Sequence, residues 1–388
     1  MKKIFSKINY PLLILTIIYS IFGCLMIYSA SSISAILRYE VSTGRFVIRQ
    51  IESSFLGFVI GFMVLFIPTK SYKYVSKLAM FGAIGALALL FVYGKVAGGA
   101  LSWFDIGSVN FQPAELAKPI LIVFLAVYYH KISLKRKITF FDMFYPLILA
   151  AAMIVLIMLQ PDMGSAFIIL AITGITFLAI PIGKDHKKNI YKVGFGFVFI
   201  FLIVAVILSS TGKSILKAYQ VKRIVEYRNP CTRYQEDSGY QVCNGYIAIH
   251  NGGLLGVGLG NSTQKYLYLP EAHTDFIFPI ICEECGLIVG IVILIGYFLI
   301  LMLILNIAKN AQNLKNSILA YGIFAYLTIH ILLNILGILG LIPLTGVPLP
   351  FLSYGGTYNL CILISMFILQ RINIENKLEK DYKKIKNL

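Results

Sequence analysis

The sequence predicts an all-α polytopic membrane protein with about ten transmembrane helices and both termini in the cytoplasm. Its composition is the first observation: 58% of the 388 residues are hydrophobic and 13% are charged, about half the charged share of a soluble chain. The second observation is a series of apolar runs of near-membrane length. The third is that every second gap between these runs is rich in lysine and arginine.

Each predicted helix has an apolar core close to the length that crosses the hydrocarbon layer, about 20 residues. In chain order, the cores are residues 10–30, 53–68, 75–94, 114–130, 144–160, 164–182, 193–210, 277–306, 317–341 and 356–372. Basic residues precede the first core and follow every even-numbered one. Since cytoplasmic gaps carry the excess of lysine and arginine, the odd-numbered gaps face outward. The first core is too long for the h-region of a signal peptide, so we expect it to be retained.

The chain is predicted to form a single transmembrane domain over residues 1–388. Its formal net charge is +17, but the basic residues are spread in short clusters between apolar runs. Nucleic-acid binding requires basic residues gathered on one face, so we expect no nucleic-acid partner. The tail, residues 373–388, is predicted to be a basic amphipathic helix along the cytoplasmic leaflet.

The longest gap, residues 211–275, joins the seventh and eighth predicted helices and forms one long extracellular loop. Its basic residues include Arg223 and Lys265, and a loop of this length is exempt from the positive-inside bias. Its charge is therefore available to hold an anionic headgroup, although a solvated basic loop explains it equally well. Cys231 and Cys243 also lie in this loop, where an oxidising exterior would permit a disulfide.

Polar residues gather at the predicted outer ends of several helices. "QPAELAK" puts Gln112, Glu115 and Lys118 at the start of the fourth helix, and a spacing of three residues allows Glu115 and Lys118 to pair. "QPDMGS" puts Asp162 near a helix N-terminus, which favours an anion. "LTGVPLPFLSYGGT", residues 344–357, is an irregular segment of the kind tolerated at membrane depth only inside protein or beside a cavity. Each segment alone fits an ordinary helix end or turn, but together they favour a shared polar cavity that opens outward.

The stretch "YLPEAHTDFIF" places Glu271, His273 and Asp275 directly before the eighth predicted helix. Charge at the edge of a membrane span is costly, so its default interpretation is functional. For Glu271, His273 and Thr274 a structural role, such as a helix cap for Thr274, is equally consistent with the pattern. The following "CEEC" contains Cys282 and Cys285, which we interpret as small packing residues because a metal site would need a second pair of ligands.

These motifs together resemble the SEDS family of bacterial cell-wall proteins, which are ten-span membrane glycosyltransferases. The resemblance covers nearly the whole chain. It is carried by "MIYSASS" (26–32), "RQ" (49–50), "QPAELAKP" (112–119), "QPDMGSA" (160–166), "GVGLGNSTQKYLYLPEAHTDFIF" (256–278) and "GVPLPFLSYGGT" (346–357). The sequence is closer to the FtsW-like division and sporulation members than to the elongation member RodA. It departs from the family pattern at Ala114 and Pro279, neither of which is a proposed catalytic position.

The resemblance implies a peptidoglycan glycosyltransferase of the bacterial cytoplasmic membrane that polymerises lipid II on the outer face and releases undecaprenyl pyrophosphate, in cell division. It places the catalytic aspartate at Asp275 and residues needed for activity at Lys118 and Arg49. The remaining residues that we expect to bind the substrate are Gln112, Glu115, Asp162, Arg223, Lys265, His273 and Ser353. The implied partners are a class B penicillin-binding protein, which is a single-span transpeptidase, and the membrane proteins of the divisome or elongasome.

Polymerisation of lipid II joins a sugar hydroxyl to an anomeric carbon, and each step of that chemistry requires a particular kind of side chain. The hydroxyl needs a positioned base, for which Asp275 is the candidate. The leaving pyrophosphate needs cations held in place, for which Lys118, Arg49, Lys265 and Arg223 are candidates. A divalent cation, Mg²⁺ or Mn²⁺, could share this load, and the sequence leaves open whether one is required.

Alternative functions fit the same topology. The same activity could serve lateral-wall elongation, as in RodA. A flippase or transporter of lipid-linked precursors would also have many spans around a polar cavity, but a carrier should place some polar residues near the membrane midplane. A scaffold that only recruits a cell-wall partner would leave the paired charges at the outer face without a purpose.

Overall fold

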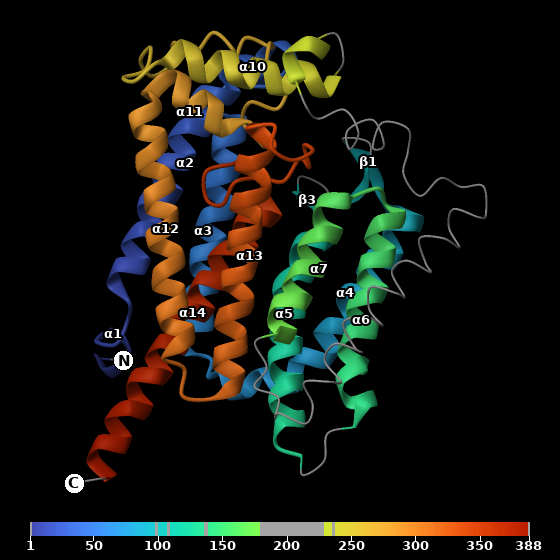
Figure 1. Ribbon diagram of the computed structural model, residues 1–388, viewed down its shortest axis with the longest axis vertical. Helices are drawn as coiled ribbons and strands as arrows, with labels where there is room; N and C mark the ends of the chain where they lie inside the picture. The colour runs from blue at the N-terminus through green and yellow to red at the C-terminus, as the bar shows by residue number, and fades with distance from the viewer. Residues whose placement is uncertain are drawn as a thin grey trace. The chain divides into compact units, whose positions relative to one another are not determined.

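The computed structural model describes residues 2–97, 100–106, 109–135, 139–178, 229–234 and 237–386, and these are mostly helical (Figure 1). Eight helical segments of this part are long and apolar enough to cross a membrane. Their helices are α2 (Tyr10–Leu37), α3 (Arg45–Phe66), α4 (Tyr72–Tyr93), α5 (Pro113–Ser133), α6 (Phe140–Leu159), α12 (Leu287–Lys309), α13 (Leu314–Ile338) and α14 (Gly356–Lys386). A shorter apolar helix, α7 (Met163–Leu178), follows α6.

Every predicted span except the seventh falls on one of these helices, so hydropathy locates them correctly. The seventh, residues 193–210, lies outside the described residues, as does Arg223. The cytoplasmic placement of the termini stays a prediction. The tail is helical, as predicted, but it continues α14 without interruption to Lys386 and does not form a separate helix.

The eighth predicted span is two helices, α11 (Ile277–Cys285) and α12, separated at Gly286. Gly286 has φ +89°, a left-handed conformation that favours glycine. A side chain there would collide with the backbone of Leu254 and Leu255. The chain before α11 thus packs directly against the α11–α12 junction, where the Leu287 amide donates to the Gly253 carbonyl at 2.9 Å. The hydropathy profile does not detect this break because the residues on both sides of Gly286 are equally apolar.

The all-α prediction is wrong for the described residues between α4 and α5. Here three short strands, β1 (Lys95–Ala97), β2 (Ala100–Ile106) and β3 (Val109–Phe111), form an antiparallel sheet in the order β1-β2-β3. Lys95 pairs with Trp103, and Phe104 pairs with Phe111. The strands are too short to show a clear alternation of polar and apolar residues, so the sequence pattern indicates only a gap between the third and fourth predicted spans.

Contacts divide the chain into two compact units, each described by itself. Unit 1 comprises Met1–Phe66, Tyr219–Ile304 and Leu327–Gln370, and unit 2 comprises Ile67–Ala218, Leu305–Tyr326 and Arg371–Leu388. In unit 1, two glycines of α3 face α14. An added Cβ would be too close to the Leu363 side chain at Gly57 and to the Phe367 ring at Gly61. Small residues of this kind let membrane helices approach closely. The single-domain interpretation of residues 1–388 stays a prediction.

The segment predicted to be the extracellular loop contains an amphipathic helix, α10 (Asp237–Gly252), preceded by a 3₁₀ turn, η3 (Pro230–Arg233). A disulfide joins Cys231 of η3 to Cys243 of α10, which are 12 residues apart in the sequence. The sequence allows this bridge and the structure contains it. Closing a loop of this size restricts the unfolded chain and stabilises the folded form by about 3 kcal/mol.

Reduction of this disulfide is expected to make the loop more sensitive to protease, because the bridge fixes η3 against α10. Limited proteolysis with and without reductant, followed by mass mapping of the cuts around residues 229–243, measures the effect. Cys231→Ser should reproduce the reduced pattern without reductant. Equal thiol labelling of Cys231 and Cys243 before and after reduction would show that the bridge is absent.

Candidate functional site

Asp275 lies in a tight turn that ends directly before α11 in unit 1. Two backbone hydrogen bonds close the turn, from the amides of Thr274 and Phe276 to the Glu271 carbonyl at 3.2 Å and 3.1 Å. The Thr274 hydroxyl lies 3.0 Å from Asp275 Oδ1 and 2.8 Å from a Glu271 carboxylate oxygen, and its single proton is available to either one. Thr274 is therefore within hydrogen-bond reach of the Asp275 carboxylate and does not cap α11, whose N-cap is Phe276 without a side-chain hydrogen bond. Asp275 retains 9% exposure, so this turn carries a largely buried carboxylate.

The irregular segment 344–355 packs against the same turn. Gly346 has φ +67°, a backbone conformation that favours glycine, and it lies beside the carboxylate, since a Cβ added there would be in ordinary contact with Asp275 Oδ2 at 3.6 Å. The Tyr354 amide donates to the His273 carbonyl at 2.9 Å. Irregular backbone at a helix end is thus enclosed by protein, as the sequence pattern requires. "HTDFIF" and "GVPLPFLSYGG" thus meet in space at these residues, whereas a shared polar cavity that opens outward stays a prediction.

Ser353 is buried, with 1% exposure, and has a structural task in this segment. Its hydroxyl accepts a hydrogen bond from the Leu349 amide at 2.8 Å, and its own amide donates to the Leu349 carbonyl at 3.1 Å. These bonds close the "LPFLS" turn. A role of Ser353 in substrate binding stays a prediction. In that role, the hydroxyl would also have to keep its hydrogen bond from the Leu349 amide.

His273 is enclosed by aromatic rings and retains 2% exposure. Its ring centroid is 4.5 Å from that of Phe46 and 5.6 Å from that of Tyr354. Burial and the nearby charge of Arg38 lower the pKa of His273 to about 4. The imidazole is therefore neutral at physiological pH and supplies no positive charge for a pyrophosphate. Its contacts fit the structural alternative, in which it shapes the turn beside Asp275.

Arg49 lies on the first turns of α3 in unit 1 and is half-buried. Burial raises the pKa of the Tyr354 hydroxyl, and a side-chain hydrogen bond from Arg49 partly offsets that rise. Tyr354 follows Ser353 and is itself bonded to the His273 carbonyl. The arginine predicted to hold the pyrophosphate thus belongs to the same group of residues as Asp275.

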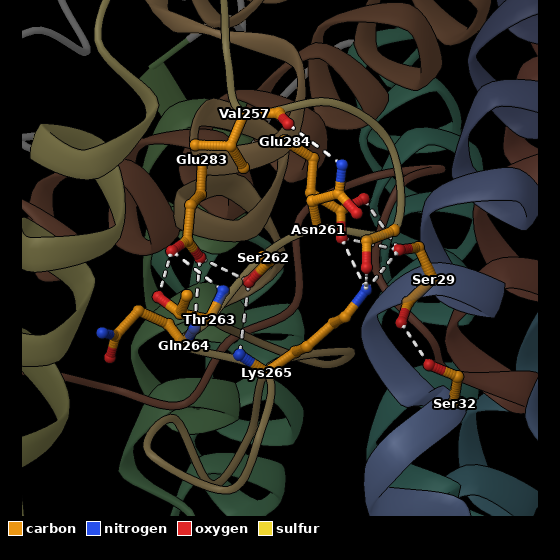
Figure 2. Close-up of polar contacts among 11 residues, drawn as sticks. Ser29, Ser32, Val257, Asn261, Ser262, Thr263, Gln264, Lys265, Glu283 and Glu284 are labelled. Atoms are coloured by element: carbon orange, nitrogen blue, oxygen red, sulfur yellow. Dashed lines mark hydrogen bonds and ion pairs between the residues drawn. The ribbon is translucent and has the colours of Figure 1, made fainter.

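Lys265 is 3% exposed and is held by protein groups in unit 1 (Figure 2). Its Nζ donates to Glu284 Oε1 at 2.9 Å, to the Gly260 carbonyl at 2.6 Å and to the Ser29 hydroxyl at 3.2 Å. Ser29 in turn donates to the Glu284 carboxylate at 2.7 Å. All three N–H groups of the ammonium are used inside the protein, so binding of substrate by Lys265, which stays a prediction, would require these contacts to break.

Glu283 forms a second buried attachment for the same loop, also visible in Figure 2. Its carboxylate accepts hydrogen bonds from the amides of Thr263 and Gln264 at 3.1 Å and 3.3 Å, and from the hydroxyls of Thr263 and Ser262. The two glutamates of α11 therefore fix residues 260–265, from which the chain continues to the Asp275 turn. The interpretation of "CEEC" from the sequence missed this role because it considered only the two cysteines. Two acids inside an apolar run were the signal that could have found it.

Removing the Lys265 ammonium should destabilise the protein strongly. Lys265→Met leaves Glu284 buried without its cation, and breaking a buried pair costs about 3–5 kcal/mol. The double variant Lys265→Met/Glu284→Gln removes both charges and should recover most of that loss. Thermal unfolding in detergent measures both, with Lys95→Met as a control because its partner Asp105 lies in an exposed pair and such pairs contribute about 0–1 kcal/mol. A double variant no more stable than Lys265→Met would show that this ion pair is not what holds the loop.

Unit 2 contains the other predicted group. Lys118 Nζ lies 2.6 Å from Glu115 Oε1 on the first turns of α5, with the two side chains 1% and 4% exposed. The predicted pairing at a spacing of three residues is therefore present, and both charges are buried. A buried ion pair gives little net stability compared with apolar residues, so its presence at a helix start favours a functional interpretation.

Gln112 and Asp162 lie beside this pair in unit 2. Asp162 Oδ1 accepts from the Ser165 amide at 2.9 Å in the first turn of α7, which confirms its expected place near a helix N-terminus. Gln112 Nε2 lies 3.5 Å from Asp162 Oδ2. Gln112, Glu115, Lys118 and Asp162 thus form one polar group in unit 2. Arg49, His273, Asp275 and Ser353 form another in unit 1.

The described residues include no group of three or more His, Cys, Asp or Glu side chains placed to hold a metal ion. Cys282 and Cys285 are free thiols. A Cβ added to Gly290 of α12 would lie 2.7 Å from the Cys282 sulfur, so Cys282 is in close packing contact, as we interpreted it. A requirement for Mg²⁺ or Mn²⁺ stays a prediction.

A family model described as "Cell cycle protein" and named for FtsW, RodA and SpoVE matches residues 10–378. This chain belongs to the FtsW/RodA/SpoVE family. The match confirms the resemblance carried by the motifs, and the chain is a multi-pass membrane protein of this family.

Relatives within this family align over almost the whole chain. "Probable peptidoglycan glycosyltransferase FtsW" of Bacillus subtilis is 36% identical and covers 99% of this chain and 95% of its own length. "Stage V sporulation protein E" of the same organism is 34% identical, over 93% and 96% of the two chains. The FtsW of Wigglesworthia glossinidia brevipalpis is 33% identical, over 98% and 97%.

Two solved structures share the fold. One, described as "Structural coordination of polymerization and crosslinking by a peptidoglycan synthase complex", matches with a TM-score of 0.71 at 22% identity over 95% of this chain and 98% of that one. The other is RodA of Thermus thermophilus, with a TM-score of 0.65 at 23% identity over 94% and 96%.

Proposed function

We infer that this chain is a peptidoglycan glycosyltransferase that polymerises lipid II on the outer face of the bacterial cytoplasmic membrane during cell division. It is an enzyme of the FtsW/RodA/SpoVE family, and relatives at 33–36% identity over nearly its full length are named as FtsW peptidoglycan glycosyltransferases. Those names support the division role over elongation. The single observation that carries the mechanism is the largely buried Asp275 carboxylate, held in a turn directly before α11.

In the proposed reaction, Asp275 accepts the proton of the acceptor sugar's 4-hydroxyl as that oxygen attacks the anomeric carbon of the donor. The C–O bond to undecaprenyl pyrophosphate breaks, and the pyrophosphate leaves with the bonding electrons. A carboxylate within hydrogen-bond reach of Thr274 and packed beside Gly346 suits this task because general-base catalysis requires a fixed geometry. The proton leaves the carboxyl group before the next addition.

The leaving pyrophosphate gains negative charge, and preorganised cations stabilise such charge most effectively where water is excluded. Arg49 in unit 1 and Lys118 in unit 2 are the proposed cations. Lys118 Nζ lies 2.6 Å from Glu115 Oε1, so this buried ammonium has a defined position. A divalent cation, if the enzyme uses one, would add to this charge stabilisation.

A class B penicillin-binding protein is the proposed partner. One solved structure with this fold is described as a peptidoglycan synthase complex that coordinates polymerisation and crosslinking. A partner that cross-links strands would consume the product of this chain directly, which is the chemical reason for the two activities to act together. Other divisome membrane proteins are expected to place the complex at the division site.

The test is lipid II polymerisation by the purified full-length protein in proteoliposomes, with and without a class B penicillin-binding protein. We expect glycan strands in the presence of the partner. A flippase would instead move labelled lipid II across vesicles without lengthening it, and a scaffold would do neither. Transport without polymer in the presence of the partner would overturn the proposal.

A further inference from the structure

Asn334, on α13 in unit 1, makes a direct link between the two segments of the Asp275 site. Its Nδ2 donates one hydrogen bond to the Asp275 carbonyl at 2.7 Å and one to the Val347 carbonyl at 2.8 Å. The residue is 3% exposed. Both N–H groups face carbonyl oxygens, which only donors can satisfy, so the amide can take just one orientation.

A second α13 residue binds the neighbouring carbonyl. His330, one turn before Asn334, has its Nδ1 3.3 Å from the Pro348 carbonyl, and its ring stacks on Tyr358 with centroids 4.7 Å apart. The Tyr358 hydroxyl donates to the same Pro348 carbonyl at 3.0 Å. Side chains thus hold two successive carbonyls of "GVPLP".

The sequence explains why this segment needs side-chain donors. Pro348 and Pro350 have no backbone N–H, so the segment cannot form a regular ladder of its own. A buried carbonyl without a donor is costly. The amide of Asn334 satisfies Val347, and the same amide reaches Asp275, which couples the two segments through one side chain.

We propose that Asn334 is a positioning residue for the polymerase reaction, and that it sets the place of the Asp275 carboxylate through the Asp275 main chain. This inference rests on the proposed function of Asp275. Without the amide, the carbonyls of Asp275 and Val347 lose the donor that they share, and the turn is free to shift relative to Gly346. A displacement of about 1 Å at a reacting group can lower a rate by about 10²-fold.

The chain offers a matched control in Asn359 of α14. It is 1% exposed, and its Nδ2 donates to the hydroxyls of Ser53 and Ser54 on α3 at 3.2 Å and 2.8 Å. Both asparagines are buried, both donate two hydrogen bonds, and both lie in unit 1. They differ in that the bonds of Asn359 join two helices and do not touch the Asp275 turn.

The test compares Asn334→Leu and Asn359→Leu in two measurements. In lipid II polymerisation with the partner, Asn334→Leu should lower kcat by about 10²-fold with little change in KM, and Asn359→Leu should have a much smaller effect on kcat. In an Asp275→Asn background, Asn334→Leu should lower the residual rate no further, because there is no base left to position. Equal losses of kcat from the two leucine variants, or a full additional loss in the Asp275→Asn background, would overturn the proposal.

Hydrogen–deuterium exchange provides the second measurement, which does not depend on activity. Exchange in residues 271–278 and 345–352 should be faster in Asn334→Leu than in wild type, and unchanged there in Asn359→Leu. Unchanged exchange of both segments in Asn334→Leu would contradict the positioning role even if the wild-type protein polymerises lipid II. Failure of the wild-type protein to polymerise, with faster exchange in Asn334→Leu, would instead count against the proposed function alone.

Discussion

Replacing Asp275 with asparagine is expected to lower lipid II polymerisation by about 10²–10⁴-fold, the usual contribution of a general base. Asparagine has nearly the same size, and its side-chain oxygen can still accept from the Thr274 hydroxyl. The bond from Asn334 goes to the main chain and is unaffected. The variant should therefore insert, fold and bind its partner, and lose only the group that accepts the proton.

The control for this loss is Asp105→Asn, the same change at an exposed residue of β2 whose partner is Lys95. It should polymerise at a rate close to wild type. Wild-type, Asp105→Asn and Asp275→Asn proteins at equal partner content are compared by glycan strand yield on gels. If Asp275 were only a residue that starts a helix, asparagine would serve that role well and the Asp275→Asn variant would be nearly normal.

Neutralising Lys118 should also cause a large loss, but by a different route. Loss of one preorganised charge that stabilises the transition state lowers kcat by about 10²–10³-fold. Lys118→Met alone also leaves Glu115 buried without its cation, which costs about 3–5 kcal/mol of stability. The defect of this single variant therefore mixes misfolding with lost chemistry.

The double variant Lys118→Met/Glu115→Gln separates the two effects. It removes both charges, so its thermal unfolding should lie close to wild type, while its KM for lipid II rises and its kcat stays low. Steady-state kinetics with the partner measures both constants. Recovery of activity together with stability would show that Lys118 and Glu115 serve the fold and do not hold the pyrophosphate.

The sequence predicts most of the helices because membrane crossing imposes a length and a composition that hydropathy detects directly. It does not predict the break at Gly286, which depends on the backbone of Leu254 and Leu255 approaching from a distant part of the chain. The sequence also does not predict β1–β3, because these strands are short and their residues show no strong periodic pattern.

The site also contains residues whose role the sequence predicts and residues whose role only the fold reveals. Asp275, Glu115 and Lys118 are predictable because charge beside a membrane span demands a reason. Lys265 appears in sequence as a cation available to substrate, whereas in the fold Glu284, Ser29 and the Gly260 carbonyl surround it. Such pairing depends on the tertiary structure and cannot be read from the charge of the loop.

Asn334 was missed because a single amide in an apolar helix carries no charge and matches no motif. Its partners, the carbonyls of Asp275 and Val347, are 59 and 13 residues away and are main-chain groups, which every residue has. Only the fold identifies which carbonyls this amide reaches.

The central claim is that Asp275 performs the proton transfer of glycan polymerisation, and a single-turnover assay tests it most directly. Wild-type and Asp275→Asn proteins, each saturated with labelled lipid II in proteoliposomes with the partner, are sampled for the first glycosidic bond formed. The account predicts equal binding of lipid II and a rate of bond formation lower by about 10²–10⁴-fold in Asp275→Asn. Bond formation at a near-wild-type rate in that variant would contradict it, and the base would then have to be sought at Asp162 or Glu115.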